Sequence, residues 1–145
     1  MTLMQVFLTI VTGVAVYVLG QAILHFVFEP IKKFNEQRSD TSFLLLFHQA
    51  KITNASNTNP QLQDDIKEMG AALISTMSLI PCYHLLTWLR VFGLPSKEDV
   101  FQAARELNGI AYGTGPVGPN ENSAVANTQA LEQIARLLGI HTGYN

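Results

Sequence analysis

The first 28 residues of this chain contain no Asp, Glu, Lys or Arg, and the first charged residue is Glu29. At about 1.5 Å of rise per residue, the apolar run over residues 3–28 is long enough to cross a hydrocarbon core of about 30 Å as a helix. A helix also satisfies its own backbone hydrogen bonds, which lipid cannot do. The sequence therefore predicts a transmembrane helix over residues 1–29 and one further domain over residues 30–145.

Two other interpretations of this run fit less well. A cleaved signal peptide begins with basic residues and ends with small ones, whereas this run has no Lys or Arg and ends in bulky residues such as Phe26 and Phe28. A buried helix of a soluble protein is usually shorter and has a polar face. The transmembrane interpretation agrees with both the length and the composition of the run.

Cysteine is nearly absent as well, because Cys82 is the only one and no internal disulfide can form. A lone thiol fits a reducing compartment. Basic residues are few, and a formal net charge of −2 provides no positive field for nucleic acid. The first ones, Lys32 and Lys33, directly follow the apolar run. By the positive-inside rule we expect the N-terminus outside and residues 30–145 in the cytoplasm.

The sequence has no alternating strand pattern, no internal repeat and no heptad run, so the predicted fold class is all-α. After the membrane helix we expect a bundle of about five helices, near residues 30–52, 61–79, 81–89, 97–112 and 128–138. Ser96 and Asp99 have the spacing of a capping box, and Gly139 is expected to end the last helix. A glycine-rich loop is predicted over residues 113–127.

Apolar clusters in these segments predict the core. Residues 43–47 (Phe-Leu-Leu-Leu-Phe) are too few to span lipid and are expected to form the central core helix. Trp88 is likewise predicted to belong to the core, and Cys82 and His84 are predicted to be packing residues. Pro30 is expected to kink the membrane helix or to begin a new one.

The apolar run carries a polar stripe. Its members recur every four residues along one slowly turning side of the helix: Tyr17, Gln21, His25 and Glu29. Polar groups in a membrane usually face a protein interior or water, and one helix has no interior. The stripe therefore predicts self-association, with these residues lining a pore or an oligomer seam. The alternative is that its inner members lie at the level of the lipid headgroups.

A second side of the same helix carries small residues. Thr9, Gly13 and Gly20 allow two helix backbones to approach closely, although their spacing is not that of a GxxxG motif. We expect these residues to form the helix–helix interface.

Motifs for chemistry are scarce. Residues 113–118 match GxGxxG, but no strand precedes them and Pro116 interrupts them, so the match does not predict a dinucleotide site. The histidines lack the spacing of a zinc site, and Cys82 with His84 lacks a third member of a catalytic set. The sequence predicts a non-enzyme with no cofactor and no metal.

Three motifs resemble a family of small uncharacterised bacterial proteins that have one N-terminal membrane helix and a helical cytoplasmic domain. They are Glu-Pro-Ile at residues 29–31, Ile-Pro-Cys-Tyr at 80–83, and the segment 94–110 that begins Leu-Pro-Ser. The likeness covers most of residues 20–112 and departs at Cys82, where the family has an aromatic residue. It implies the fold and a bacterial inner membrane, but no activity.

More loosely, the layout is similar to that of small membrane effectors of bacterial anti-phage systems, such as the Hailong effector. That resemblance implies a homo-oligomeric ion channel, as a tetramer, which depolarises the membrane in abortive infection and is controlled by a nucleotide or oligonucleotide on its cytoplasmic domain. The nearest basic contacts for such an anion are Lys32, Lys33, Arg38 and Lys51. The alternative role of these residues is to retain the domain in the cytoplasm.

Two other functions stay open. The chain is alternatively a membrane-tethered helical adaptor or scaffold that docks a cytoplasmic protein partner. An enzyme acting on a membrane substrate would need a site that the sequence does not contain.

Overall fold

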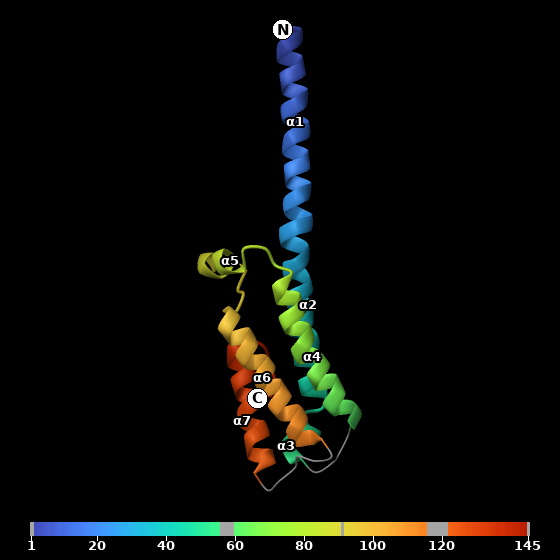
Figure 1. Cartoon of the computed structure of the whole chain (residues 1–145), viewed down its shortest axis with the longest axis vertical. Coiled ribbons are helices and arrows are strands. Elements are labelled where there is room, and N and C mark those ends of the chain that lie inside the picture. The colour runs from blue at the N-terminus through green and yellow to red at the C-terminus, as the bar shows by residue number, and fades with distance from the viewer. Residues whose placement is uncertain (1, 56–59, 91, 116–121, 145) are drawn as a thin grey trace.

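The computed structural model describes residues 2–55, 60–90, 92–115 and 122–144, and these residues form helices and connections without a strand. A long apolar helix precedes a helical domain, as predicted (Figure 1). The elements in chain order are α1 (Leu3–Ile23), η1 (Leu24–Phe28), α2 (Glu29–Phe47), α3 (Gln49–Asn54), α4 (Pro60–Ser78), α5 (Tyr83–Leu89), α6 (Lys97–Thr114) and α7 (Ser123–Leu138). The described domain therefore contains the six helices α2 to α7, against about five predicted.

The first three elements form one continuous helix, Leu3–Phe47, whose N-terminal part projects away from the domain (Figure 1). No residue of α1 is buried, and its large apolar side chains lie open on all sides. Among the described residues, this is the only unbroken helix that is long enough and apolar enough to cross a membrane.

Pro30 accounts for the wider turn η1 within this helix. Proline has no backbone N–H, and its ring collides with the carbonyl four residues earlier, which here belongs to Phe26. The backbone N–H of Glu29 accordingly bonds to the carbonyl of Leu24, five residues back, which is the spacing of a π-helix. Proline thus widens the helix without breaking it, where the sequence had predicted a kink or a new start.

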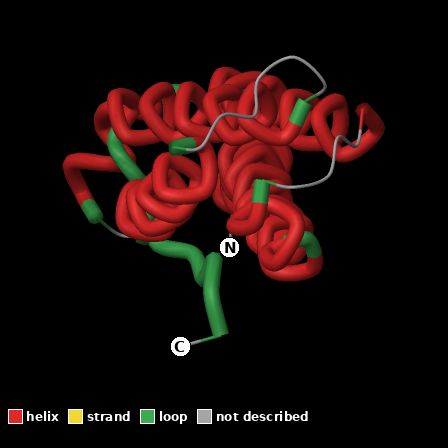
Figure 2. The backbone as a smooth tube through the Cα atoms, turned by 90° about the horizontal axis from the view of Figure 1, so that it is seen from below, coloured by secondary structure: helices red, strands yellow, loops and turns green. Residues whose placement is uncertain are grey.

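The domain packs α4 against both α2 and α6, and α6 against α7, while the short α3 lies on α7. Figure 2 looks along the long axis from the domain end and shows these helices gathered around a common centre. The largest fully buried apolar side chains are Phe34, Leu45, Ile52, Leu62, Ile66, Leu73, Leu107, Ile110, Ile134, Leu138 and Val100. The core is therefore built entirely by the elements that follow α1.

The structure confirms the two helix-end signals that the sequence predicted, one at the start of α6 and one at the end of α7. Ser96 Oγ accepts a hydrogen bond from the backbone N–H of Asp99 (3.1 Å), and Asp99 Oδ2 accepts one from the N–H of Ser96 (3.1 Å). This is the predicted capping box, and it satisfies donors that the first turn of α6 would leave free. Gly139 ends α7 in the left-handed conformation (φ 61°), as its position predicted.

The short helix α5 is turned by 89° from α4. Cys82 before it and Arg90 after it both have left-handed backbones (φ 51° and 50°), which redirects the chain at each end. Figure 1 shows α5 beside the top of the domain, at the level where α1 meets it. The Phe28 ring meets the Phe92 ring edge-on with centroids 5.6 Å apart, which joins the segment after α5 to the base of the apolar helix.

Several predicted core residues are exposed. Phe43 and Phe47 are 69% and 70% exposed, whereas Leu45 between them is fully buried. A run of five residues in a helix covers more than one full turn, so only part of it can face the core. Trp88 is 78% exposed, and Cys82 and His84 lie open near it. The predicted core cluster is therefore confirmed for Leu45, with Leu44 packed against the core, and was wrong for Phe43 and Phe47. The predictions of a buried tryptophan and of two packing residues were wrong.

The predicted glycine-rich loop was also too long. Helix α6 continues to Thr114 and α7 begins at Ser123, five residues before the predicted start at 128. Residues 116–118 of the GxGxxG match lie outside the described residues.

Candidate functional site

The polar stripe spans three elements of the leading helix. Tyr17 and Gln21 belong to α1, His25 to η1 and Glu29 to α2. Tyr17 is 67% exposed and has no protein neighbour to cover it. The described chain thus leaves the upper part of the stripe open to whatever surrounds α1.

The two lower members of the stripe bind each other. His25 Nδ1 lies 2.7 Å from Glu29 Oε1, on one side of the helix and largely exposed. Residues four apart on a helix are neighbours on its surface, which places these two side chains within hydrogen-bonding reach. The contact supplies each side chain with one polar partner and leaves its remaining hydrogen-bonding capacity open to the exterior.

The small-residue side of α1 is open as well. The Thr9 hydroxyl donates to the carbonyl of Gln5 (2.8 Å), so this hydroxyl needs no outside partner. A Cβ added at Gly13 or Gly20 would meet nothing within 4 Å. The chain itself therefore places no helix against the predicted interface.

The four predicted basic contacts do not come together. Lys32 lies 3.6 Å from Glu36 in an exposed pair on α2, and Lys33 and Lys51 are exposed on α2 and α3. Arg38 points instead into the domain, where its guanidinium donates to Asn35 Oδ1 (3.0 Å) and to the carbonyl of Leu138 at the end of α7.

Arg38 has two neighbours that the sequence did not single out. Arg90, directly after α5, and Arg136, in the last turn of α7, line the same pocket of about 440 Å³. Each lies three residues before a glycine, Gly93 or Gly139, with φ near 60°. In the sequence, a basic residue shortly before a glycine indicates the C-terminal end of a helix. It does not indicate which helix ends lie close together in the fold, so the sequence could not predict this pocket.

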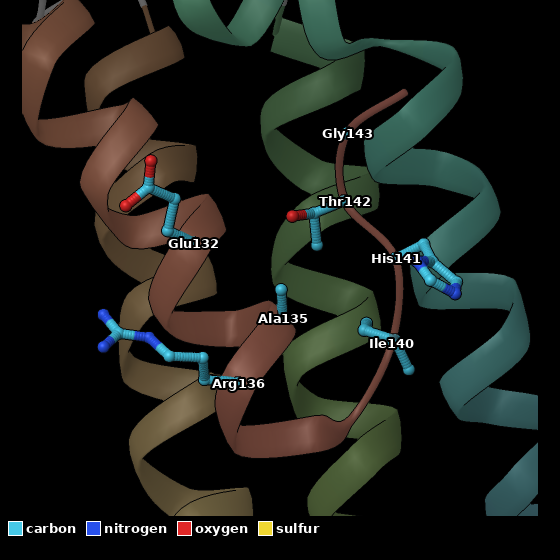
Figure 3. Close-up of a pocket in the computed structure, with 7 residues that line it drawn as sticks. All are labelled: Glu132, Ala135, Arg136, Ile140, His141, Thr142 and Gly143. Carbon is cyan, nitrogen blue, oxygen red and sulfur yellow. The ribbon is translucent and has the colours of Figure 1, made fainter. Parts of the chain in front are cut away.

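A second pocket, of about 490 Å³, lies between α7 and the segment that follows it. Figure 3 shows Glu132 and Arg136 extending from α7 on the side away from His141. The Thr142 hydroxyl, which lines this pocket, is already committed to the carbonyl of Leu131 (3.0 Å). These polar groups do not converge on one point, and this arrangement supports no catalytic set.

Metal ligands do not gather in the part of the chain that the structure describes: no three His, Cys, Asp or Glu side chains there could hold an ion. His84 lines an apolar pocket with Tyr83 and Phe101, without an acid or a thiol among its lining residues.

Comparison with protein-family models, with curated proteins and with solved structures found no match. The family and effector resemblances read from the sequence therefore stay expectations, and the site has to be interpreted from its own geometry.

Proposed function

We propose that this protein is the subunit of a homo-oligomeric ion-channel effector in a bacterial inner membrane. In this proposal α1 crosses the bilayer, and the stripe of Tyr17, Gln21, His25 and Glu29 lines the oligomer seam or pore. One observation carries it: the second half of the apolar run bears a polar stripe, yet the helix α1, where the stripe begins, has no buried residue within its own chain.

The two predicted surfaces of α1 are compatible with one assembly. At about 100° per residue, Thr9, Gly13 and Gly20 fall within about 40° of one another around the helix. Tyr17 and Gln21 flank that face on one side. Helices that approach through the small residues would therefore bring the start of the polar stripe toward the centre of the bundle.

In this proposal the helical domain regulates the opening of the channel. It lies on the cytoplasmic side, according to the placement of Lys32 and Lys33 after the apolar run. A nucleotide or oligonucleotide is the proposed class of regulator, and the role in anti-phage defence is supported by the resemblance of layout alone. No catalytic reaction and no cofactor are assigned.

Membrane potential tests the channel. Induced expression in bacteria, followed with a voltage-sensitive dye, is expected to depolarise the cells. Gly13→Leu, which fills the close-approach face, should reduce depolarisation severalfold and weaken chemical crosslinking between copies. Val11→Leu adds bulk at a similar depth, two residues away on the opposite side of the helix, and serves as the matched control. Normal potential with the protein verified in the membrane would contradict the proposal, as would a monomer at every concentration.

A second function is favoured by an exposed aromatic pair on the domain. The rings of Phe43 and Phe47 lie parallel with centroids 5.9 Å apart, near the end of α2 that is remote from α1. Large apolar side chains left open in this way are typical of docking surfaces for protein partners. The chain would then be a membrane-tethered adaptor.

An anchor exchange separates the two functions. Replacing residues 3–28 with an unrelated membrane helix preserves an adaptor and abolishes a channel. The double substitution Phe43→Ser with Phe47→Ser does the reverse, because it removes the docking pair and leaves α1 intact.

A further inference from the structure

Three arginines from three elements surround one pocket of about 440 Å³. Arg38 comes from α2, Arg90 follows α5, and Arg136 belongs to the last turn of α7. No carboxylate lines this pocket, and within the described chain none of the three forms a salt bridge. The remaining lining residues are Gly93, Leu94, Pro95, Leu137, Leu138 and Gly139.

Arg38 at the inner side of the pocket is held in position but is not neutralised. Its guanidinium donates to Asn35 and to the backbone carbonyls of Gly93 and Leu138, while its Nε is buried without a partner. Burial lowers the pKa of Arg38, which shows that its charge is partly removed from water. An anion in the pocket would offset that cost, and the planar fork of arginine suits phosphate oxygens.

The pocket lies at the end of the domain that faces the apolar helix. The connection Gly93–Pro95 on its rim leads from α5 to α6, and α5 is level with the base of α1 (Figure 1). Phe28, the last residue of the apolar run, meets Phe92 beside this connection. Arg38 lies ten residues, or about 15 Å, further down the helix from Phe28, and helical side chains lean toward the N-terminus, which is toward the membrane here.

The apolar surface beside the pocket indicates where the phosphate comes from. Leu85, Trp88 and Leu89 of α5 are 54%, 78% and 48% exposed. Because α5 is turned by 89° from α4, it lies across the long axis of the molecule and parallel to the surface of a bilayer that α1 crosses. Tryptophan on such a helix is typical of the zone between headgroups and acyl chains.

We propose that the pocket of Arg38, Arg90 and Arg136 binds the headgroup phosphate of an anionic lipid, with α5 lying in the membrane interface. The proposal rests on α1 crossing the bilayer, which is part of the proposed function, but it does not require a channel. Failure of depolarisation therefore leaves it standing, and failure of lipid binding leaves the channel standing.

Short-chain lipids test the pocket directly. The full chain in neutral detergent is titrated with dihexanoyl phosphatidylglycerol, and binding is followed through Trp88, the only tryptophan of the protein. Dihexanoyl phosphatidylcholine serves as the zwitterionic comparison, and inorganic pyrophosphate as the soluble source of phosphate. Arg90→Gln and Arg136→Gln are each expected to raise the dissociation constant for the anionic lipid about fivefold.

Arg105→Gln is the matched control, because Arg105 is exposed on α6 outside the pocket and its loss changes the net charge equally. It should leave lipid binding unchanged. Equal binding of both lipids, or equal losses in all three variants, would overturn the pocket. Pyrophosphate binding that depends on Arg90 and Arg136, without binding of the anionic lipid, would overturn the lipid as the source.

The depth of α5 in the membrane is tested separately, by quenching of Trp88 fluorescence. In vesicles containing phosphatidylglycerol, lipids brominated near the headgroup end of the acyl chain are expected to quench Trp88 more strongly than lipids brominated near the chain end. Arg90→Gln together with Arg136→Gln should weaken that quenching. No quenching by either lipid would place α5 in water and contradict the proposal.

Discussion

Two glycines of α6 differ sharply in what surrounds them. A Cβ at Gly113 would lie 2.7 Å from Oδ1 of Asn127, and Asn127 Nδ2 donates to the buried carbonyl of Ile52 (2.9 Å). A Cβ at Gly109 would meet nothing within 4 Å. The close approach at Gly113 is thus what allows one polar side chain to bind α3 and α7 together.

We expect Gly113→Ala to displace Asn127 and to leave buried polar groups unpaired, at a cost of about 1–3 kcal/mol in the free energy of unfolding. The melting temperature in detergent should fall by about 2–4 °C for each kcal/mol. Gly109→Ala, four residues earlier on the same helix, should instead stabilise by about 0.5–1 kcal/mol because alanine restricts the unfolded chain. A loss at both positions would show that helix α6 tolerates no alanine for reasons other than Asn127.

Tyr83 gives the domain a dependence on alkaline pH. Burial raises the pKa of Tyr83 to about 12, and its hydroxyl donates to the carbonyl of Pro95 (2.7 Å). An unfolded tyrosine loses its proton near pH 10, so the unfolded state binds fewer protons between about pH 10 and 12. The stability from this difference, about 2–3 kcal/mol, is complete below pH 10 and is lost as pH rises toward 12.

Tyr83→Phe should lower the free energy of unfolding at pH 8 by about 1 kcal/mol, because the hydrogen bond to Pro95 is lost. Its melting temperature should then fall less steeply than that of wild type between pH 10 and 12. Tyr112→Phe, at a residue that is 62% exposed, is the control and should follow the wild-type slope. Parallel slopes for Tyr83→Phe and wild type would contradict the assignment.

At the scale of elements, the widened turn η1 has an identifiable cause in Pro30. Pro30→Ala restores the missing N–H and removes the ring that displaces the carbonyl of Phe26, a change worth about 3 kcal/mol within a helix. We expect η1 to become α-helical, and amide hydrogen exchange over residues 24–34 to slow by tenfold or more in detergent. Pro60→Ala, at the first residue of α4 where the N–H has no helical partner, should leave exchange unchanged. Equal exchange rates in Pro30→Ala and wild type would mean that the proline does not cause the wide turn.

Signals contained within one element were predictable from the sequence. The capping box of Ser96 and Asp99 and the terminal Gly139 depend on spacings of a few residues, and the structure has both of them. The start of helix α7 was predicted too late, because the polar residues within 123–127 were interpreted as part of a loop. Asn127 is in fact 3% exposed and bound to Ile52, a partner that spacing cannot reveal.

Features that depend on distant segments escaped sequence reasoning. Trp88 is apolar enough for a core, and only the turn at Cys82 shows that its helix leaves the domain. The stripe from Tyr17 to Glu29 was placed on the leading helix because four-residue spacing is local, whereas the pocket of Arg38, Arg90 and Arg136 joins residues nearly a hundred positions apart. Local periodicity cannot bring such residues together.

At the scale of the whole molecule, the chain divides into a long apolar helix without buried residues and a domain whose core excludes it. The two parts meet where η1 passes into α2 and where Phe28 touches Phe92. This division fits a protein whose first part is solvated by lipid and whose second part is solvated by water. It also places one exposed cysteine, Cys82, on the domain side of that boundary.

That single cysteine makes the predicted orientation measurable without introducing a label site. If residues 30–145 lie in the cytoplasm, a membrane-impermeant maleimide added to intact spheroplasts should leave Cys82 unmodified, and lysis should expose it to full modification. In a Cys82→Ser background, Thr2→Cys should show the opposite pattern, because the N-terminal end of α1 then faces the reagent. Modification of Cys82 before lysis would place the domain outside, and a protein that stays in the soluble fraction after lysis would show that α1 does not cross the membrane at all.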